Sequence, residues 1–313
     1  MRQYSWEKKG LIYVPDGIGY FKSHAARSIP YQLNDDIIRL FLTSRDDDDR
    51  LLPSYIDLDI RDPKHVLHIN DKPLLGFGRM GTFDDSGITP GSIIHKNHEV
   101  LIYYTGWKRR RINVTFELSI GLCRLDSDGF TFIRLWDGPI LAQDINHPIL
   151  TAGPFVIYDN HIFKMWYCSG TEWRTCEGNP EPIYHVRYAE SENGVDWIPI
   201  NKPVIDYKYD GEVISAPWVI KHKSLYYMWY STRGSATKIN KQYVIGYAES
   251  CDGINWTRAD ESVGISRSEY GWDSEMICYP SFFPYKDKIY MFYSGNNVGR
   301  GGVGYAVMDN FLL

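Results

Sequence analysis

Apolar and polar residues alternate along much of the chain, in runs that stop at short clusters of Gly, Pro, Asn and Asp. Alternation with a period of two is typical of strands that bury one face, and no window has a sustained helical period. The stretch SEMICYPSFFPYKDKIYMFYSGN, from Ser274 to Asn296, is one example, in which an acid precedes two aromatic-rich runs. The pattern therefore predicts an all-β protein.

The strand pattern repeats at a fixed interval. Five aromatic strand ends, RLFLTSR, LIYYTGW, KMWYCSG, YMWYSTR and YMFYSGN, align with one another. Their anchor residues, each 63 residues after the one before, are Phe41, Tyr104, Tyr167, Tyr230 and Tyr293. Five anchors at one spacing indicate a repeat architecture that covers the whole chain.

A second element follows several anchors and completes the repeat. It is an alternating strand, then a turn at Asp128-Gly129, Asn193-Gly194 or Asp252-Gly253, then an aromatic residue. These dipeptides favour hairpins because Asn, Asp and Gly accept positive φ angles. Each repeat thus holds about four antiparallel strands. Five such repeats predict a single domain, residues 1–313, folded as a five-bladed β-propeller.

The last repeat is shorter than the others. GRGGVGYAVMDNFLL supplies a third strand before the chain ends, whereas KKGLIYVPD near the N-terminus is a spare strand. We expect this N-terminal strand to close the ring as the outer strand of the last blade, because that pairing removes two exposed sheet edges.

Three carboxylates share one position in the repeat. Asp85, Glu212 and Glu275 each stand five residues before a proline, at the predicted entrance of a blade's first strand. First strands of a propeller line its axis, so we expect the three side chains to face one pocket as catalytic groups. Crowded like charges near a desolvated axis raise at least one pKa, which suits acid and base chemistry. The structural alternative is that these acids cap backbone N–H groups or hold channel water.

Further residues on the same face are candidates for substrate binding. Arg45, Trp107 and Arg233 follow corresponding strand ends, where arginine can hold a carboxylate or phosphate and tryptophan can stack on a sugar. The alternative is that the arginines form salt bridges between blades. Asp273 shares a strand face with Glu275 and is an alternative catalytic partner. The binding candidates are His24, Arg45, Arg79, Asp84, Trp107, Glu172, His185, Arg233, Asp273 and Asn296.

Composition narrows the class of partner. The 313 residues include 24 Tyr and 10 Trp, which suit both strands and the flat faces of sugars. A net charge of −5 provides no basic field for nucleic acid or an anionic membrane. The five cysteines form no CxxC pair and the N-terminus has no long apolar run, so we expect a cytoplasmic protein. Because no HxH or HExxH spacing occurs, we expect no cofactor, and a structural metal ion in the channel is the remaining alternative.

In its five repeats, its YAESCDGINW strand–turn–strand element and its inner-strand acids, the chain resembles the five-bladed propeller glycosidases. These are the arabinanase and xylosidase group (glycoside hydrolase family 43), the invertase and levansucrase group, and the mannoside phosphorylases of family 130. The WMNDPNG and EDPR signatures of the last two groups are absent, and the chain is more similar to glycosidase-like propellers of polysaccharide gene clusters. The resemblance implies that Asp85 acts as base or nucleophile, with Glu212 and Glu275 as pKa modulator and proton donor.

Three alternative functions follow. The first is an enzyme that cleaves or transfers a glycosidic bond with one protonated and one ionised carboxyl group. The second is a phosphorylase or glycosyltransferase that uses a sugar phosphate or nucleotide sugar, with Arg45, Arg79 and Arg233 holding the phosphate. The third is a non-catalytic propeller that binds sugars or proteins. The expected partner is therefore a carbohydrate or a sugar phosphate.

Overall fold

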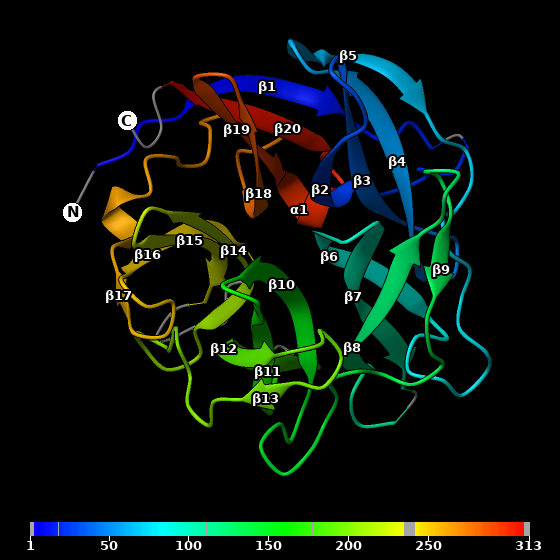
Figure 1. Ribbon diagram of the computed structural model, residues 1–313, viewed down its shortest axis with the longest axis vertical. Helices are drawn as coiled ribbons and strands as arrows, with labels where there is room; N and C mark the ends of the chain where they lie inside the picture. Colours follow the sequence, from blue (N-terminus) through cyan, green and yellow to red (C-terminus); the bar gives the residue numbers. More distant parts are fainter. Residues whose placement is uncertain (1–2, 18, 111, 177, 235–241, 310–313) are drawn as a thin grey trace.

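The computed structural model describes residues 3–17, 19–110, 112–176, 178–234 and 242–309. Its strands form four sheets set around a common centre (Figure 1). Three sheets have four strands each, and the fourth has eight, because one parallel pair, Leu51 and Gly87, joins the strands of the first two repeats. The all-β prediction is confirmed in these residues, but four sheets occur where five separate blades were predicted. None of their helices has the length and apolar character that crossing a membrane requires.

The strands occupy equivalent positions in successive repeats, counted from the centre outward. The innermost strands are β2 (Ala26–Gln32), β6 (Gly87–Lys96), β10 (Thr151–Asp159), β14 (Val213–His222) and β18 (Cys278–Tyr285). The second strands are β3 (Ile37–Arg45), β7 (Glu99–Arg109), β11 (Ile162–Cys176), β15 (Leu225–Arg233) and β19 (Lys288–Ser294). The third strands are β4 (Leu51–Asp59), β8 (Phe116–Leu125), β12 (Asn179–Ser191), β16 (Val244–Ser250) and β20 (Val303–Asp309). The outer strands are β5 (Asp62–Ile69), β9 (Phe132–Arg134), β13 (Ile198–Pro199), β17 (Trp256–Arg258) and β1 (Glu7–Tyr13). Two short helical turns, η1 (Asp260–Ser262) and α1 (Asn296–Gly299), complete the described elements.

The innermost strands contact one another in a closed order: β2 with β6, β6 with β10, β10 with β14, β14 with β18, and β18 with β2. Each of them has a β-bulge near its start. At four of the bulges one residue has a positive φ angle: Arg27 (54°), Gly153 (57°), Ala216 (49°) and Tyr279 (55°). Three of these residues are not glycine, so the backbone is strained where the strands converge.

The N-terminal strand lies in the place that the sequence predicted for it. β1 pairs antiparallel with β20, from Glu7 opposite Val307 to Tyr13 opposite Val303, and is the outer strand of the sheet β1-β20-β19-β18 (Figure 1). Trp6, which precedes the paired residues by one position, packs edge-on against Trp229 in the core. The start of the chain therefore covers an edge that β20 would otherwise expose.

The anchor residues are buried on the second strands, and most of them stand opposite a glycine of the neighbouring third strand. Tyr230 is fully buried and stands opposite Gly246 of β16, and a Cβ added to Gly246 would lie 2.3 Å from Cε2 of the tyrosine. Glycine also stands opposite Tyr104 and Tyr293. The tyrosine hydroxyl extends past the glycine and donates a hydrogen bond to Asp260. The repeated glycine is thus required for close packing between neighbouring strands.

We predict that Gly246→Ala lowers the free energy of unfolding by about 1–3 kcal/mol, because the new methyl group overlaps the buried ring of Tyr230. Denaturant unfolding measures the change. Gly138→Ala is the matched control, because an added Cβ there meets no atom within 4 Å. Equal stability of the two variants would contradict the close packing.

Candidate functional site

A hollow of about 1080 Å³ lies at the end of the sheets where the innermost strands begin, and we call it the mouth. Its charged and aromatic lining residues are Arg45, Asp49, Asp85, Trp107, Arg109, Arg110, Phe116, Glu181, Arg233, Tyr243 and Tyr279. They come from the ends of second strands, the starts of third strands and the segments that lead into the first strands. A hollow of this size has room for a sugar-sized ligand.

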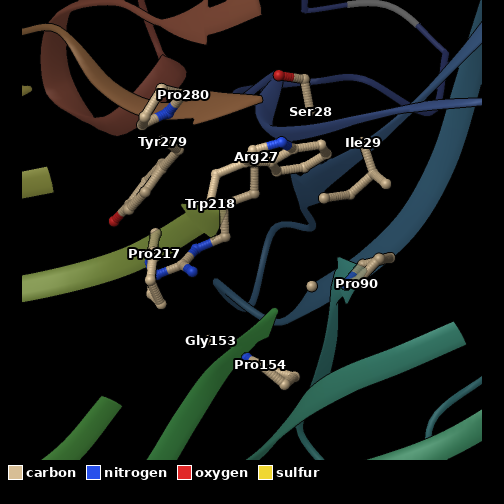
Figure 2. Close-up of a pocket in the computed structure, with 12 residues that line it drawn as sticks. Arg27, Ser28, Ile29, Pro90, Gly153, Pro154, Pro217, Trp218, Tyr279 and Pro280 are labelled. Atoms are coloured by element: carbon tan, nitrogen blue, oxygen red, sulfur yellow. The ribbon is translucent and has the colours of Figure 1, made fainter. Parts of the chain in front are cut away.

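Two smaller cavities lie closer to the axis. One, of about 80 Å³, is lined mainly by apolar and aromatic side chains and by a single charged residue, Arg27. The other, of about 30 Å³, is lined by the bulges of all five innermost strands (Figure 2). Tyr279 lines both of these cavities and the mouth, so its ring stands where the three meet.

The carboxylates of the mouth differ in their partners. Asp49 pairs with Arg45 at 2.7 Å, and Glu181 pairs with Arg233 at 3.1 Å. Asp85 forms no ion pair within the described residues. Its carboxylate accepts hydrogen bonds from the backbone N–H of Gly81 (2.9 Å) and from the Ser86 hydroxyl (2.7 Å). Asp85 is thus held in place by neutral donors while its charge stays uncompensated by any described cation.

Two arginines and three tyrosines form a layered cluster at the inner end of the mouth. The guanidinium of Arg27 lies 4.0 Å from the ring centre of Tyr279, and that of Arg233 lies 5.1 Å from the ring centre of Tyr243. The two rings are 5.9 Å apart, and the hydroxyls of Tyr243 and Tyr184 are hydrogen-bonded at 2.7 Å. Burial raises the pKa of Tyr279 and of Tyr184, although the nearby arginines oppose the shift. Both phenols therefore stay protonated at neutral pH and can donate hydrogen bonds.

Four of the residues proposed from the sequence line the mouth: Arg45, Asp85, Trp107 and Arg233. Trp107 donates its indole N–H to the Thr89 hydroxyl at 3.1 Å, which fixes the orientation of its ring. The predicted correspondence of the three strand ends is therefore visible in the structure, where they surround one hollow.

The three proposed catalytic carboxylates do not come together. Glu212 is 1% exposed and is bound by Arg258 through two hydrogen bonds of 2.7 and 2.9 Å and by the Thr232 hydroxyl at 2.8 Å. Glu275 is exposed, and its backbone N–H donates to Oδ1 of Asn296 at 2.8 Å. Neither of them lines the mouth or the two axial cavities. All three proposed acids precede the first residue of their strand, so their directions are set by the conformation of the connecting segments, and a shared position in the repeat does not fix them.

Asp84 and Asp273 have partners of the same kind as Glu212. Asp84 is fully buried, pairs with Arg134 at 2.8 Å and accepts a hydrogen bond from the anchor Tyr104 at 3.0 Å. Asp273 pairs with Lys8 of β1 at 2.7 Å, and its carboxylate accepts a hydrogen bond from the anchor Tyr293 at 3.0 Å. These acids stabilise the sheets from within and leave the mouth to other groups.

The remaining binding candidates lie outside the mouth. His24 bonds to the Ser23 hydroxyl at 2.8 Å, and burial together with the charge of Arg45 lowers its pKa to about 4. Three others have charged partners outside the mouth: Arg79 pairs with Asp137 at 2.5 Å, Glu172 with Arg174 at 2.5 Å, and His185 with Asp206 at 3.3 Å. Asn296 caps the turn before β18 through two backbone N–H groups. The described residues contain no group of three or more His, Cys, Asp or Glu side chains able to hold a metal ion.

Several residues of the mouth escaped the sequence argument. They are Arg109, Glu181, Tyr243 and Tyr279, and Arg27, which lines the adjoining 80 Å³ cavity, escaped it too. A signal was present, because Arg27 and Tyr279 stand a whole number of 63-residue steps apart, at the position that the bulge occupies in other repeats. An arginine and a tyrosine at a place where the other repeats carry proline, glycine and alanine would have marked the centre of the site.

We predict that Glu212→Gln lowers the free energy of unfolding by about 3 kcal/mol, because Arg258 loses its main buried counter-charge. Glu172→Gln removes one partner of an exposed pair and should change stability by less than about 1 kcal/mol. Thermal and denaturant unfolding of both variants make the test. A Glu212→Gln protein as stable as the wild type would argue against a structural role for this acid.

Several known proteins are similar to this chain in sequence or in fold. No family model matches the chain. A 1,2-beta-oligomannan phosphorylase of Thermoanaerobacter sp. (strain X514) is 28% identical over 135 residues, which are 40% of this chain and 43% of that protein. A solved glycoside hydrolase superposes with a TM-score of 0.75 at 17% identity and covers 99% of this chain and 93% of its own. A structure from the GH130 family of mannoside phosphorylases superposes with a TM-score of 0.69 at 15% identity and covers 98% of this chain and 94% of its own.

These solved structures show that the fold is that of glycoside hydrolase-like propeller proteins. A protein of Mycobacterium tuberculosis (strain ATCC 25618 / H37Rv), "Uncharacterized protein Rv1502", is 34% identical over 308 residues, which are 98% of this chain and all of that protein. The protein therefore belongs to the same family as the mycobacterial protein Rv1502.

Proposed function

We propose that this protein is a five-bladed β-propeller enzyme that cleaves or transfers a glycosidic bond in its mouth. The closed order of contacts among the five innermost strands supports five blades, and the pairing of β1 with β20 supports a closed ring. The single observation that carries the function is Asp85: a carboxylate without a described counter-charge, held by two hydrogen bonds, on the wall of a sugar-sized hollow.

In this proposal Asp85 is the base or nucleophile. Its two neutral donors orient the carboxylate without neutralising it, so it can accept a proton from water or attack a sugar carbon. Trp107 and Phe116 are the aromatic surfaces of the mouth on which a sugar face can stack. Tyr279 remains protonated and is placed to donate a hydrogen bond to a sugar oxygen. Glu212 has no part in this chemistry, because its contacts lie inside the sheet.

A second candidate is a phosphorylase or a transferase that uses a sugar phosphate. It is favoured by the charge of the mouth, whose lining includes four arginines and three carboxylates, Asp49, Asp85 and Glu181. Arginine matches the geometry of phosphate oxygens through paired N–H donors. The partial similarity to a phosphorylase points the same way.

The test is a screen of aryl glycosides and sugar phosphates, with and without inorganic phosphate, followed by Asp85→Asn on the best substrate. We expect this variant to lose about 10²–10⁴-fold in kcat with its unfolding midpoint unchanged. Turnover that requires added phosphate would decide for the phosphorylase.

Glu275→Gln is the discriminating control, because Glu275 is exposed and lies outside the mouth. It should retain wild-type kcat. If no substrate is turned over, and Asp85→Asn binds sugars as tightly as the wild type, the protein is a non-catalytic sugar-binding propeller and the proposal fails.

A further inference from the structure

Arg27 is the most unusual side chain near the axis. It occupies the bulge of β2 with a φ angle of 54°, a conformation that non-glycine residues adopt only under strain. Its side chain extends from β2 into the pocket between Tyr279 and Pro217 (Figure 2). Strained residues and charges at the convergence of five strands are costly, and they mark functional positions in proteins.

The guanidinium of Arg27 has no counter-charge. No carboxylate among the described residues lies within 4.0 Å of it, and its side chain donates no hydrogen bond to a described group. It lies over the face of Tyr279, and the 80 Å³ cavity that it lines carries no other charged residue. Arg45 and Arg233, two arginines that line the mouth, each have a carboxylate partner. Arg27 is only partly buried, so its guanidinium can be reached from the cavity, and a partly desolvated cation gains from an anion that binds there.

Arg233 adds unused donors from the neighbouring side of the cluster. It is 7% exposed, and only its Nη2 reaches Glu181, while Nε and Nη1 are buried and have no hydrogen-bond partner in the described chain. Its guanidinium lies against Tyr243, whose ring packs on Tyr279. The two arginines thus lie against the two rings of one tilted tyrosine pair, and Arg233 adds positive charge near the tyrosines that line the cavity of Arg27.

We propose that Arg27 forms an anion subsite in the 80 Å³ cavity beside the inner end of the mouth, which binds the carboxylate or phosphate group of a charged sugar substrate. The inference rests on the proposed function and specifies its substrate class. The 80 Å³ cavity beside Arg27 is several times the volume that a water molecule needs and fits a compact oxyanion. The planar guanidinium provides paired donors for such a group, and the protonated Tyr279 and Tyr184 add hydroxyl donors.

The experiment measures binding of three probes by isothermal titration calorimetry and by the shift in unfolding temperature. The probes are inorganic phosphate, glucuronate as a sugar carboxylate, and glucose as a neutral sugar. We expect an anion to bind the wild type more tightly than glucose, and Arg27→Met to weaken that binding by about tenfold or more while leaving glucose binding unchanged. Tight binding of glucuronate but not phosphate identifies a sugar acid, and the reverse identifies a phosphate.

Arg79→Met is the matched control, because Arg79 is exposed and pairs with Asp137 outside the mouth, and it should bind anions like the wild type. Without ligand, Arg27→Met should unfold at the same or a higher temperature than the wild type, because an uncompensated charge has been removed. If Arg27→Met does not fold, Arg27→Lys serves instead, and should bind anions about tenfold more weakly because lysine lacks the planar pair of donors.

Anion binding that is absent in the wild type, or unchanged in Arg27→Met, overturns the subsite. Neutral glycosides turned over without any effect of anions would overturn the subsite and leave the proposed function standing. Anion binding that depends on Arg27 in a protein that turns over no glycoside would support the subsite and overturn the proposed function.

Discussion

A buried carboxylate that joins an anchor tyrosine to a distant cation is the contact on which the sheets depend. Asp84 accepts a hydrogen bond from Tyr104 and pairs with Arg134, and Asp273 pairs with Lys8 of the N-terminal strand. A buried acid is stable only when its charge and lone pairs are satisfied, so each of these contacts ties two or three strands into one arrangement. In the sheet β1-β20-β19-β18 the cation is Lys8 of the N-terminal strand. Its ion pair with Asp273 therefore connects the two ends of the chain.

This use of acids in the sheets determines what chemistry the mouth can carry. Asp84 and Asp85 are neighbours in sequence, yet one is fully buried against Arg134 and the other lines the mouth with neutral donors. Glu212 likewise belongs to the sheet. The mouth therefore keeps a single uncompensated carboxylate among several arginines. Such a site suits a substrate that carries negative charge of its own, in addition to the aromatic surfaces that suit a sugar.

The backbone strain of the fold is concentrated where the innermost strands converge. Five bulged strands converge on a cavity of about 30 Å³, and positive φ angles at Arg27, Ala216 and Tyr279 are part of the bend. Glycine would relieve that strain, and Gly153 does so in one strand. The retention of an arginine and a tyrosine at equivalent places, with the guanidinium stacked on the ring, fits a site in which side chains are needed at the axis.

The sequence by itself determined the all-β character, the spacing of the buried anchors, the hairpin turns and the partner of the N-terminal strand. These features follow from local rules, because alternation, turn residues and unpaired edges are properties of neighbouring residues. It also placed Arg45, Trp107 and Arg233 together with Asp85, and these four residues line one hollow, since equivalent strand ends and strand entrances lie at one end of the sheets. Only the tertiary structure decided which acids are buried within the sheets and which charged side chain has no counter-charge among the described residues. Glu212 has its cationic partner 46 residues away and Asp273 has one 265 residues away, whereas Arg27 has no carboxylate partner among the described residues. Such pairings are set by how the sheets pack rather than by spacing along the chain.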